Sequence, residues 1–134
     1  MDFTFGIVTG GNNEGAVNQI INSIERQNIP NYEIIVVGSF KIDRKNTTVL
    51  PFNETIKQGW ITRKKNLITD AAQYENIVYL HDYVMFTDGW YAGQIKAGSD
   101  FKVRMDKIID IHGNRFRDWS AWCHNPNSPE FNAL

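Results

Sequence analysis

The sequence predicts an α/β domain in which a mostly parallel sheet is flanked by helices. Short apolar segments suited to strands alternate along the chain with segments whose apolar residues recur at helical spacing. Residues 34–37 are apolar throughout, which is typical of a parallel strand covered on both faces. The first strand-like segment runs directly into a glycine turn that marks its end. Strands and helices in this order imply right-handed crossovers and a parallel sheet.

The elements are expected in a definite order along the chain. The strands are expected at residues 3–8, 34–37, 49–52 and 76–80, and the helices at residues 16–27, 58–73 and 88–96. Asn12 or Asn13 can cap the first helix, because an asparagine side chain accepts hydrogen bonds from free backbone N–H groups. Pro30 ends this helix, since proline cannot continue one. The second helix is expected to bury Ile61, Ile68, Ala71 and Ala72.

The pattern changes beyond residue 100. Apolar and charged residues alternate over 101–106, which predicts a half-exposed strand. A turn at 111–114 and a return strand at 115–119 would complete a C-terminal β-hairpin. Residues 125–134 hold two prolines and three asparagines and are expected to form a loop tail. The whole chain is predicted to be a single domain.

Composition restricts the classes of function. The formal net charge is -1, and no block of lysines and arginines is long enough to follow a nucleic-acid backbone, so nucleic acid is not an expected partner. No apolar run approaches the roughly 20 residues that a membrane-spanning helix needs. The first residues lack the features of a secretory signal, and the single cysteine, Cys123, fits a reducing compartment. A soluble, cytoplasmic protein is therefore expected.

Glycines and polar residues follow three of the expected strands. They are Thr9, Gly10 and Gly11 after the first strand, Gly38 and Ser39 after the second, and His81, Asp82 and Tyr83 after the strand at 76–80. Tight turning alone explains a glycine pair. Ligands of open parallel sheets, however, bind beyond the carboxyl ends of the strands, near the point where strand order reverses. Three such ends facing one crevice indicate a ligand site.

The start of the second helix carries three cations, Arg63, Lys64 and Lys65, followed by Asn66. Cations near a helix N-terminus oppose the helix dipole, so helix stability does not explain them. One interpretation is a solvated basic face. The other is that these groups neutralise a diphosphate, for which lysine and arginine are natural donors.

His81 and Asp82 emerge abruptly after an apolar strand. A carboxylate in this place can bind Mg²⁺ or Mn²⁺, which would bridge phosphate oxygens and neutralise a leaving diphosphate. The histidine suits Mn²⁺ better than Mg²⁺. In the structural alternative, Asp82 caps a turn and His81 packs against it.

A nicotinamide cofactor is a weaker interpretation of the first turn. Thr-Gly-Gly-x-x-x-Gly resembles the opening of a short-chain dehydrogenase, but that fingerprint needs glycines where this chain has Glu14 and Ala16. No Tyr-x-x-x-Lys pair occurs in the chain to supply the proton donor of such enzymes.

Taken together, these segments resemble the family 2 glycosyltransferases that have a GT-A fold. In that family a basic-Asn motif on a helix precedes a strand that ends in an Asp-x-Asp metal motif. Here the strand at 76–80 and its end, His81-Asp82-Tyr83, follow about ten residues after Asn66. The run 113–119 resembles the hairpin of a subgroup that is frequent in viral and environmental sequences. The resemblance covers about residues 3 to 122.

The resemblance implies a Rossmann-like sheet of the GT-A type and transfer of a sugar from a nucleoside-diphosphate-sugar donor to a hydroxyl acceptor. Its donor site would comprise Thr9, Gly10 and Gly11 at the base and ribose, Gly38 and Ser39 at the second strand end, Lys65 and Asn66 at the diphosphate, and His81. Asp82, with His81, would hold a divalent cation, Mn²⁺ or Mg²⁺.

The chain departs from the family pattern in three places. Many relatives carry an aspartate at the second strand end, where this chain has Gly38 and Ser39, and only the middle residue of the Asp-x-Asp motif is a carboxylate. Relatives also continue into a strand and helix that carry the acidic general base, beyond the point where this chain stops. An inverting transfer needs such a base to deprotonate the acceptor hydroxyl. The carboxylates that remain are Asp106, Asp110 and Asp118, and none of them matches the base of the family. Asp118, beside Trp119, is the candidate for acceptor contact and the catalytic candidate.

Two classes of function therefore stay open. One is a glycosyltransferase acting on an acceptor glycan or another hydroxyl compound, and the other is a truncated, non-catalytic nucleotide-sugar-binding module of the same fold. A short α/β domain can leave a sheet edge or an apolar face uncovered, and a homodimer would be one way to cover it.

Overall fold

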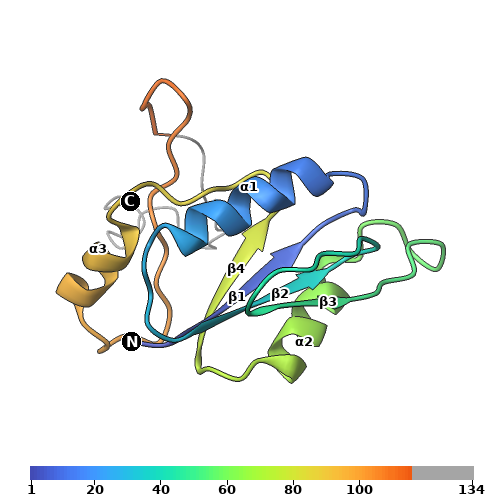
Figure 1. Cartoon of the computed structure of the whole chain (residues 1–134), viewed down its shortest axis with the longest axis horizontal. Helices are drawn as coiled ribbons and strands as arrows, with labels where there is room; N and C mark the ends of the chain where they lie inside the picture. Colours follow the sequence, from blue (N-terminus) through green and yellow to red (C-terminus); the bar gives the residue numbers. More distant parts are fainter. Residues whose placement is uncertain (116–134) are drawn as a thin grey trace, which may run out of the picture. The chain divides into compact units, whose positions relative to one another are not determined.

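A computed structural model describes residues 1–115 of the chain. The chain divides into two compact units, Met1–Ser99 and Asp100–Leu134. The first unit is a sheet of four parallel strands in the order β3-β2-β1-β4, with helices on both faces (Figure 1). The predicted α/β class with a Rossmann-like parallel sheet is confirmed. The assignment of the whole chain to a single domain stays a prediction.

The strands and helices alternate as the sequence predicts. The strands are β1 (Phe3–Val8), β2 (Tyr32–Val37), β3 (Thr47–Leu50) and β4 (Asn76–His81), and the helices are α1 (Glu14–Glu25), α2 (Ile61–Ala71) and α3 (Trp90–Ala97). Phe3 lies opposite Tyr32 on one side and Asn76 on the other, so β1 is paired along its whole length with both neighbours. Since β2 and β3 lie on one side of β1 and β4 on the other, strand order reverses at β1. The switch point of the sheet therefore lies between the ends of β1 and β4.

One face of the sheet is covered by α1, whose apolar residues recur at helical spacing. The buried side chains of α1 are Val17, Ile20, Ile21 and Ile24, together with Ser23. Each fully buried aliphatic side chain contributes roughly 1.5–3 kcal/mol relative to exposure. Asn13 occupies the N-cap position but makes no side-chain capping bond, and such a bond contributes only about 1 kcal/mol. Packing against the sheet therefore holds this helix in place.

An aromatic cluster closes the same face near the N-terminus of the chain. The ring of Trp90 in α3 lies 5.3 Å from Phe3, 5.7 Å from Phe5 and 4.5 Å from Phe86, measured between centroids. The buried amide of Gln27 joins α1 to this region, since its Nε2 donates to Thr87 O and its Oε1 accepts from Tyr91 N. The segment that leads from β4 into α3 is thus attached to the end of α1.

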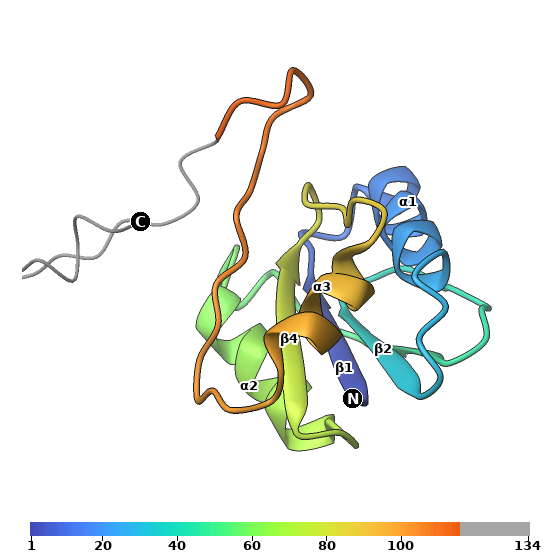
Figure 2. The same ribbon diagram turned by 90° about the vertical axis from the view of Figure 1, so that its left-hand side faces the viewer.

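The opposite face of the sheet is covered by α2, as Figure 2 shows with α1 and α2 on either side of the strands. The helix lies unusually close to β1 at Gly6. A Cβ atom on Gly6 would lie 2.4 Å from Ile68 Cγ2, so any side chain at this position would collide with α2. Ile68 is fully buried and packs with Val8, Ile35 and Val37.

Three details of the first unit correct the sequence-based expectations. Ile61 is 42% exposed and Ala71 is exposed, so their predicted burial is wrong. The face of α2 that meets the sheet carries Lys64 one turn before Ile68, and Lys64 is 2% exposed. The predicted capping bond from Asn13 is absent, because its amide is used elsewhere.

The described part of the second unit, residues 100–115, contains an isolated antiparallel bridge between Ile109 and Arg115. The bridge closes a turn in which the Asp110 carboxylate accepts hydrogen bonds from the backbone N–H groups of His112 and Asn114, at 2.8 and 2.9 Å. The turn predicted at 111–114 is confirmed. The strand predicted at 101–106 is wrong, because alternation suits any extended chain and a strand also needs a paired neighbour. The rest of the hairpin and the tail at 125–134 lie outside the described residues.

Replacing Gly6 by alanine is expected to lower the free energy of unfolding by about 1–3 kcal/mol, because the new Cβ overlaps the buried Ile68 side chain. Urea unfolding followed by circular dichroism measures the change. Gly93→Ala in α3 is the matched control, since nothing lies within 4 Å of its Cβ position. Alanine has a higher helix propensity than glycine, so the free energy of unfolding of the control should stay the same or rise by up to about 1 kcal/mol. Equal unfolding midpoints for Gly6→Ala and the wild type would contradict this close packing.

Candidate functional site

Thr9 lies directly after β1 and connects the ends of three strands. It is 3% exposed. Its Oγ1 donates to Asp82 Oδ2 at 2.8 Å and accepts from Gly11 N at 3.3 Å. Its own N–H donates to Val37 O at the end of β2. The ends of β1, β2 and β4 and the first turn therefore form one hydrogen-bonded unit at the switch point of the sheet.

Asp82 is held through its side chain and its backbone. Thr9 binds the carboxylate, and Asn13 Nδ2 donates to the Asp82 carbonyl oxygen at 3.2 Å. This second bond explains why Asn13 does not cap α1. The asparagine at the start of the helix instead attaches the end of β4, about 70 residues later in the sequence, to the first turn. Asp82 itself is half-buried.

Two of the predicted site glycines are required where the first turn meets the end of β2, Gly38 by close packing and Gly11 by its backbone conformation. A Cβ on Gly38 would lie 2.6 Å from Thr9 Cγ2. Gly11 has a φ of +88°, in the left-handed region that favours glycine, and its Cβ position lies 3.4 Å from Ser39 Cβ. Gly10 is exposed. The structure thus brings the two predicted loop ends into contact.

Ser39 is exposed, and its hydroxyl donates to Phe52 O at 3.2 Å. This bond attaches the end of β2 to the segment that follows β3. The residues predicted to line the nucleoside part of a ligand, from the first turn to Ser39, therefore form a continuous rim.

His81 and Tyr83 stack beside Asp82, with ring centroids 5.3 Å apart and planes at 18°. Burial lowers the pKa of His81 below its ordinary value, and the positive charge of Lys65 lowers it further. The negative charge of Asp82 opposes both effects without cancelling them. The neutral imidazole, which is the form that binds a metal ion, is therefore favoured.

The cations at the start of α2 do not share one environment. Lys64 is buried, and its Nζ donates to Thr9 O at 2.7 Å and to Glu54 Oε1. Lys65 is half-buried with its Nζ 5.5 Å from the centroid of the Tyr79 ring, and Asn66 is exposed. Lys65 is thus placed near His81, whereas Lys64 lies beneath Thr9. Charge alone does not distinguish these two lysines in the sequence. The signal was the four-residue spacing of Lys64 and the buried Ile68, which puts both on one helix face.

The donor set at this place suits a cation that is shared with a ligand. Within residues 1–115 no three or more His, Cys, Asp and Glu side chains gather as they do around a protein-bound metal. Asp82 and His81 supply two ligands at most. Mg²⁺ is usually held by one or two carboxylates together with substrate phosphates and water. The predicted binding of Mn²⁺ or Mg²⁺ fits this chemistry and stays a prediction, and Asp118 lies outside the described residues.

A surface pocket of the first unit lies elsewhere. It has a volume of about 380 Å³ and is lined by residues near the starts of β2 and β3 and after α2, among them Tyr32, Thr47 and Tyr74. These are the amino ends of the strands, opposite to the switch point. We assign the candidate site to the carboxyl ends, because parallel sheets bind ligands there and because Thr9 and Asp82 meet there.

The Thr9 hydroxyl is expected to stabilise the fold. Thr9→Val keeps the shape of the side chain and removes the bonds to Asp82 and Gly11, so the free energy of unfolding should fall by about 1–2 kcal/mol. The matched control is Thr48→Val on the exposed edge strand β3, expected to change stability by less than about 0.5 kcal/mol. Urea unfolding compares the two, and an equal effect would contradict the role of Thr9.

The titration of His81 tests the electrostatics of the site. In buffer with EDTA, the NMR titration midpoint of His81 should lie below the ordinary 6.5, rise in Lys65→Met and fall further in Asp82→Asn. As the pH falls through the unfolded-state pKa near 6.5, the unfolded chain takes up the proton first. The contribution of His81 to stability is therefore present above that pH and is lost below it. A midpoint at or above 6.5 in the wild type would contradict this environment.

Comparison with known proteins adds a likeness of fold. No family model and no characterised protein sequence matches the chain. The crystal structure of S. aureus TarS 1-349, a GT-A-type glycosyltransferase, is similar with a TM-score of 0.55 and 18% sequence identity. The match covers 69% of this chain and 31% of the TarS chain. No helix within residues 1–115 has the length and apolar character needed to cross a membrane. The first unit has a glycosyltransferase-like α/β fold.

Proposed function

We propose that this chain binds a nucleoside-diphosphate sugar and takes part in transfer of the sugar to a hydroxyl acceptor. The observation that carries the proposal is the hydrogen bond between Thr9 and Asp82, which holds a carboxylate at the switch point of a parallel sheet. The likeness of fold to a GT-A glycosyltransferase supports it.

In this proposal the nucleoside lies against the rim formed by the first turn and the end of β2. The rim residues are Thr9, Gly10, Gly11, Gly38 and Ser39. Their close packing offers backbone groups rather than bulky side chains, which suits the flat face of a base and its ribose. Because the end of β2 lacks a carboxylate, this part of the site does not select a base by charge.

The diphosphate lies between the start of α2 and the end of β4. Lys65 supplies positive charge there and Asn66 supplies an amide. Asp82 and the neutral His81 are the residues that would hold a divalent cation there. When bound, that cation neutralises the charge that grows on the leaving diphosphate.

The acceptor end of the reaction needs a proton acceptor. In an inverting transfer the acceptor hydroxyl oxygen bonds to the anomeric carbon, the bond to the diphosphate breaks, and the hydroxyl proton passes to a base. Asp118, beside Trp119, is our candidate for contact with the acceptor, and no carboxylate of the chain is assigned as the base.

The second candidate function is a non-catalytic module that binds the same ligand. It is favoured because, within residues 1–115, no three or more His, Cys, Asp and Glu side chains gather around a possible metal position. Incubation with a sugar donor separates the two candidates, because an enzyme releases free sugar by slow hydrolysis and a module binds the donor unchanged.

The proposal predicts thermal stabilisation that needs both a nucleoside diphosphate and a metal ion. In a panel of UDP, GDP, CDP and NAD with and without Mn²⁺, a diphosphate with Mn²⁺ should raise the melting temperature, as ligands that bind only the folded state do. Asp82→Ala should abolish the dependence on Mn²⁺. Asp70→Ala, which removes an exposed carboxylate of α2, is the matched control and should respond like the wild type.

Each possible result bears on a different part of the proposal. No response to any nucleotide would overturn both the enzyme and the module. A response that Asp82→Ala leaves unchanged would remove Asp82 from the metal site. Stabilisation by NAD alone would favour a dehydrogenase-type site over a glycosyltransferase.

A further inference from the structure

Lys64 is the one buried charged side chain within residues 1–115, at 2% exposure. An ammonium group carries three N–H donors, and burial is costly unless they are paired. Its Nζ donates to Thr9 O at 2.7 Å and to the Glu54 carboxylate, and it lies 4.8 Å from the centroid of the Phe52 ring. The protein itself therefore surrounds this cation on three sides.

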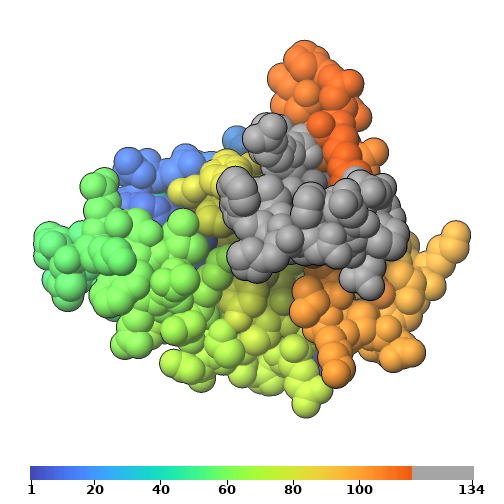
Figure 3. Space-filling model, turned by 180° about the vertical axis from the view of Figure 1, so that it is seen from behind, coloured from blue at the N-terminus to red at the C-terminus, as the bar shows by residue number. Residues whose placement is uncertain are grey.

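Glu54 belongs to residues 51–60, here called the β3–α2 segment, which forms part of the surface with α2 (green in Figure 3). Its other carboxylate oxygen accepts from Gly59 N at 3.0 Å, which closes the segment on itself. Burial raises the pKa of Glu54, but its hydrogen bonds to Lys64 and Gly59 and the Lys64 charge outweigh burial and lower it. The ionised carboxylate is thus the form that the fold favours.

Few other contacts attach this segment. Ser39 donates to Phe52 O at 3.2 Å, while Ile56 is 74% exposed and Lys57 is exposed. A segment with little buried apolar surface depends on its polar attachments for a fixed position. Phe52, half-buried, packs against the core cluster of Val8, Ile35, Val37 and Ile68, and the Lys64–Glu54 pair is the polar attachment that reaches the interior.

The same lysine also reaches the candidate site. Its partner Thr9 O belongs to the residue whose Oγ1 donates to Asp82. A continuous chain of contacts therefore runs from Glu54 through Lys64 and Thr9 to Asp82. A change at Lys64 would therefore affect both the position of the β3–α2 segment and the position of the Asp82 carboxylate.

We propose that Lys64 is a positioning residue that fastens the β3–α2 segment and Thr9 into one wall of the donor site. It does this without binding the ligand, because its donors are used within the protein. The assignment of that wall to a donor site rests on the proposed function, whereas the fastening does not.

The alternative role for Lys64 is a direct contact with phosphate after Glu54 has moved away. The two roles differ in what the ligand must contain. A phosphate contact matters only to ligands that carry phosphate. A displaced wall weakens the binding of every ligand that contacts the wall, including a nucleoside without phosphate.

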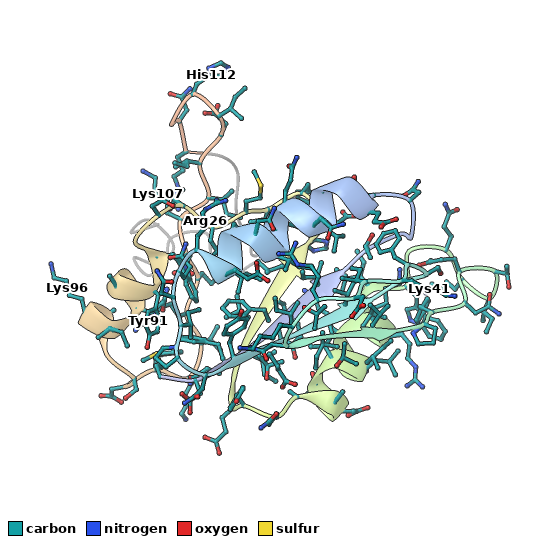
Figure 4. The ribbon with its side chains drawn as sticks, in the orientation of Figure 1. Arg26, Lys41, Tyr91, Lys96, Lys107 and His112 are labelled. Atoms are coloured by element: carbon teal, nitrogen blue, oxygen red, sulfur yellow. The ribbon has the colours of Figure 1, made fainter. Side chains whose placement is uncertain are left out.

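The first experiment measures the fastening without any ligand. Trypsin cuts after Lys57 in the β3–α2 segment and after Lys41 in the loop between β2 and β3, where Figure 4 labels it. Lys64→Met should raise the rate of cleavage after Lys57 relative to Lys41 by about tenfold, since local opening governs such cleavage. Glu54→Gln, which leaves the buried lysine in place, should raise it less. Arg63→Gln, an exposed neighbour on α2, is the matched control and should leave the ratio unchanged.

The second experiment measures binding of uridine, UMP and UDP by calorimetry. If GDP or CDP gives a larger thermal shift than UDP, the corresponding guanosine or cytidine series is used in its place. Each of the variants Glu54→Gln and Lys64→Met should weaken the binding of uridine, UMP and UDP by one factor that is the same for the three ligands. If Lys64→Met does not fold, Glu54→Gln carries both measurements, because it changes a partly exposed side chain.

The outcomes separate this proposal from the proposed function. An unchanged cleavage ratio in both variants would overturn the fastening. Faster cleavage combined with weaker binding of UMP and UDP alone would overturn the positioning role in favour of a phosphate contact. Faster cleavage in a protein that binds none of the nucleosides or nucleotides would overturn the donor site and the proposed function, and leave only the fastening.

Discussion

The hydrogen bond from Thr9 to Asp82 joins residues 73 positions apart, and the geometry of the candidate site depends on it. It follows from the parallel register of β1 and β4, in which Val8 lies opposite His81. The residues that follow these two in each strand, Thr9 and Asp82, therefore lie side by side. A slip of one residue would turn Thr9 to the other side of the sheet and break the contact. The register is in turn fixed by the difference between the two faces of β1, since Phe3, Phe5 and Ile7 pack in the core on the α1 side, whereas Thr4, Gly6 and Val8 lie on the α2 side. Ordinary strand packing thus determines the position of the carboxylate.

The distance between α2 and the sheet is the second constraint. Gly6 allows Ile68 to lie against β1, and Lys64, one turn earlier on the same face of α2, then reaches Thr9 O. A larger residue at Gly6 would move the helix outward and withdraw the ammonium group from its buried acceptor. Since a buried charge without partners is far more costly than one lost van der Waals contact, the position of α2 and the pairing of Lys64 are coupled. Stability and site geometry depend here on the same contact.

Features that follow from local periodicity could be predicted from the sequence. Features that depend on a contact with a residue distant in the sequence could not. The strands and α1 were predictable because burial on a regular element leaves a regular pattern. The glycines at the ends of β1 and β2 lie where these two strand ends pack together. Asn13 occupies a capping position, yet its amide binds Asp82 O, a partner that no local rule can name. Lys64 was grouped with its solvated neighbours, because charge alone does not reveal an internal carboxylate such as Glu54. The alternation of apolar and charged residues at 101–106 is compatible with any extended chain. It does not show whether a neighbouring strand is present, so the predicted strand was wrong.

A site with one carboxylate and one neutral imidazole has a physical consequence under the proposed function. Two protein ligands would leave most of the coordination of a divalent cation to phosphate oxygens and water, so the protein alone would bind the cation weakly. A diphosphate would likewise meet the ammonium group of Lys65, because Lys64 is already paired with Glu54. Each ligand therefore completes the site for the other, and linkage requires that each raises the affinity for the other by the same factor. Neither a metal-free nucleotide nor a free metal ion should be a strong ligand, and their joint binding is the property that a site with this donor set can provide.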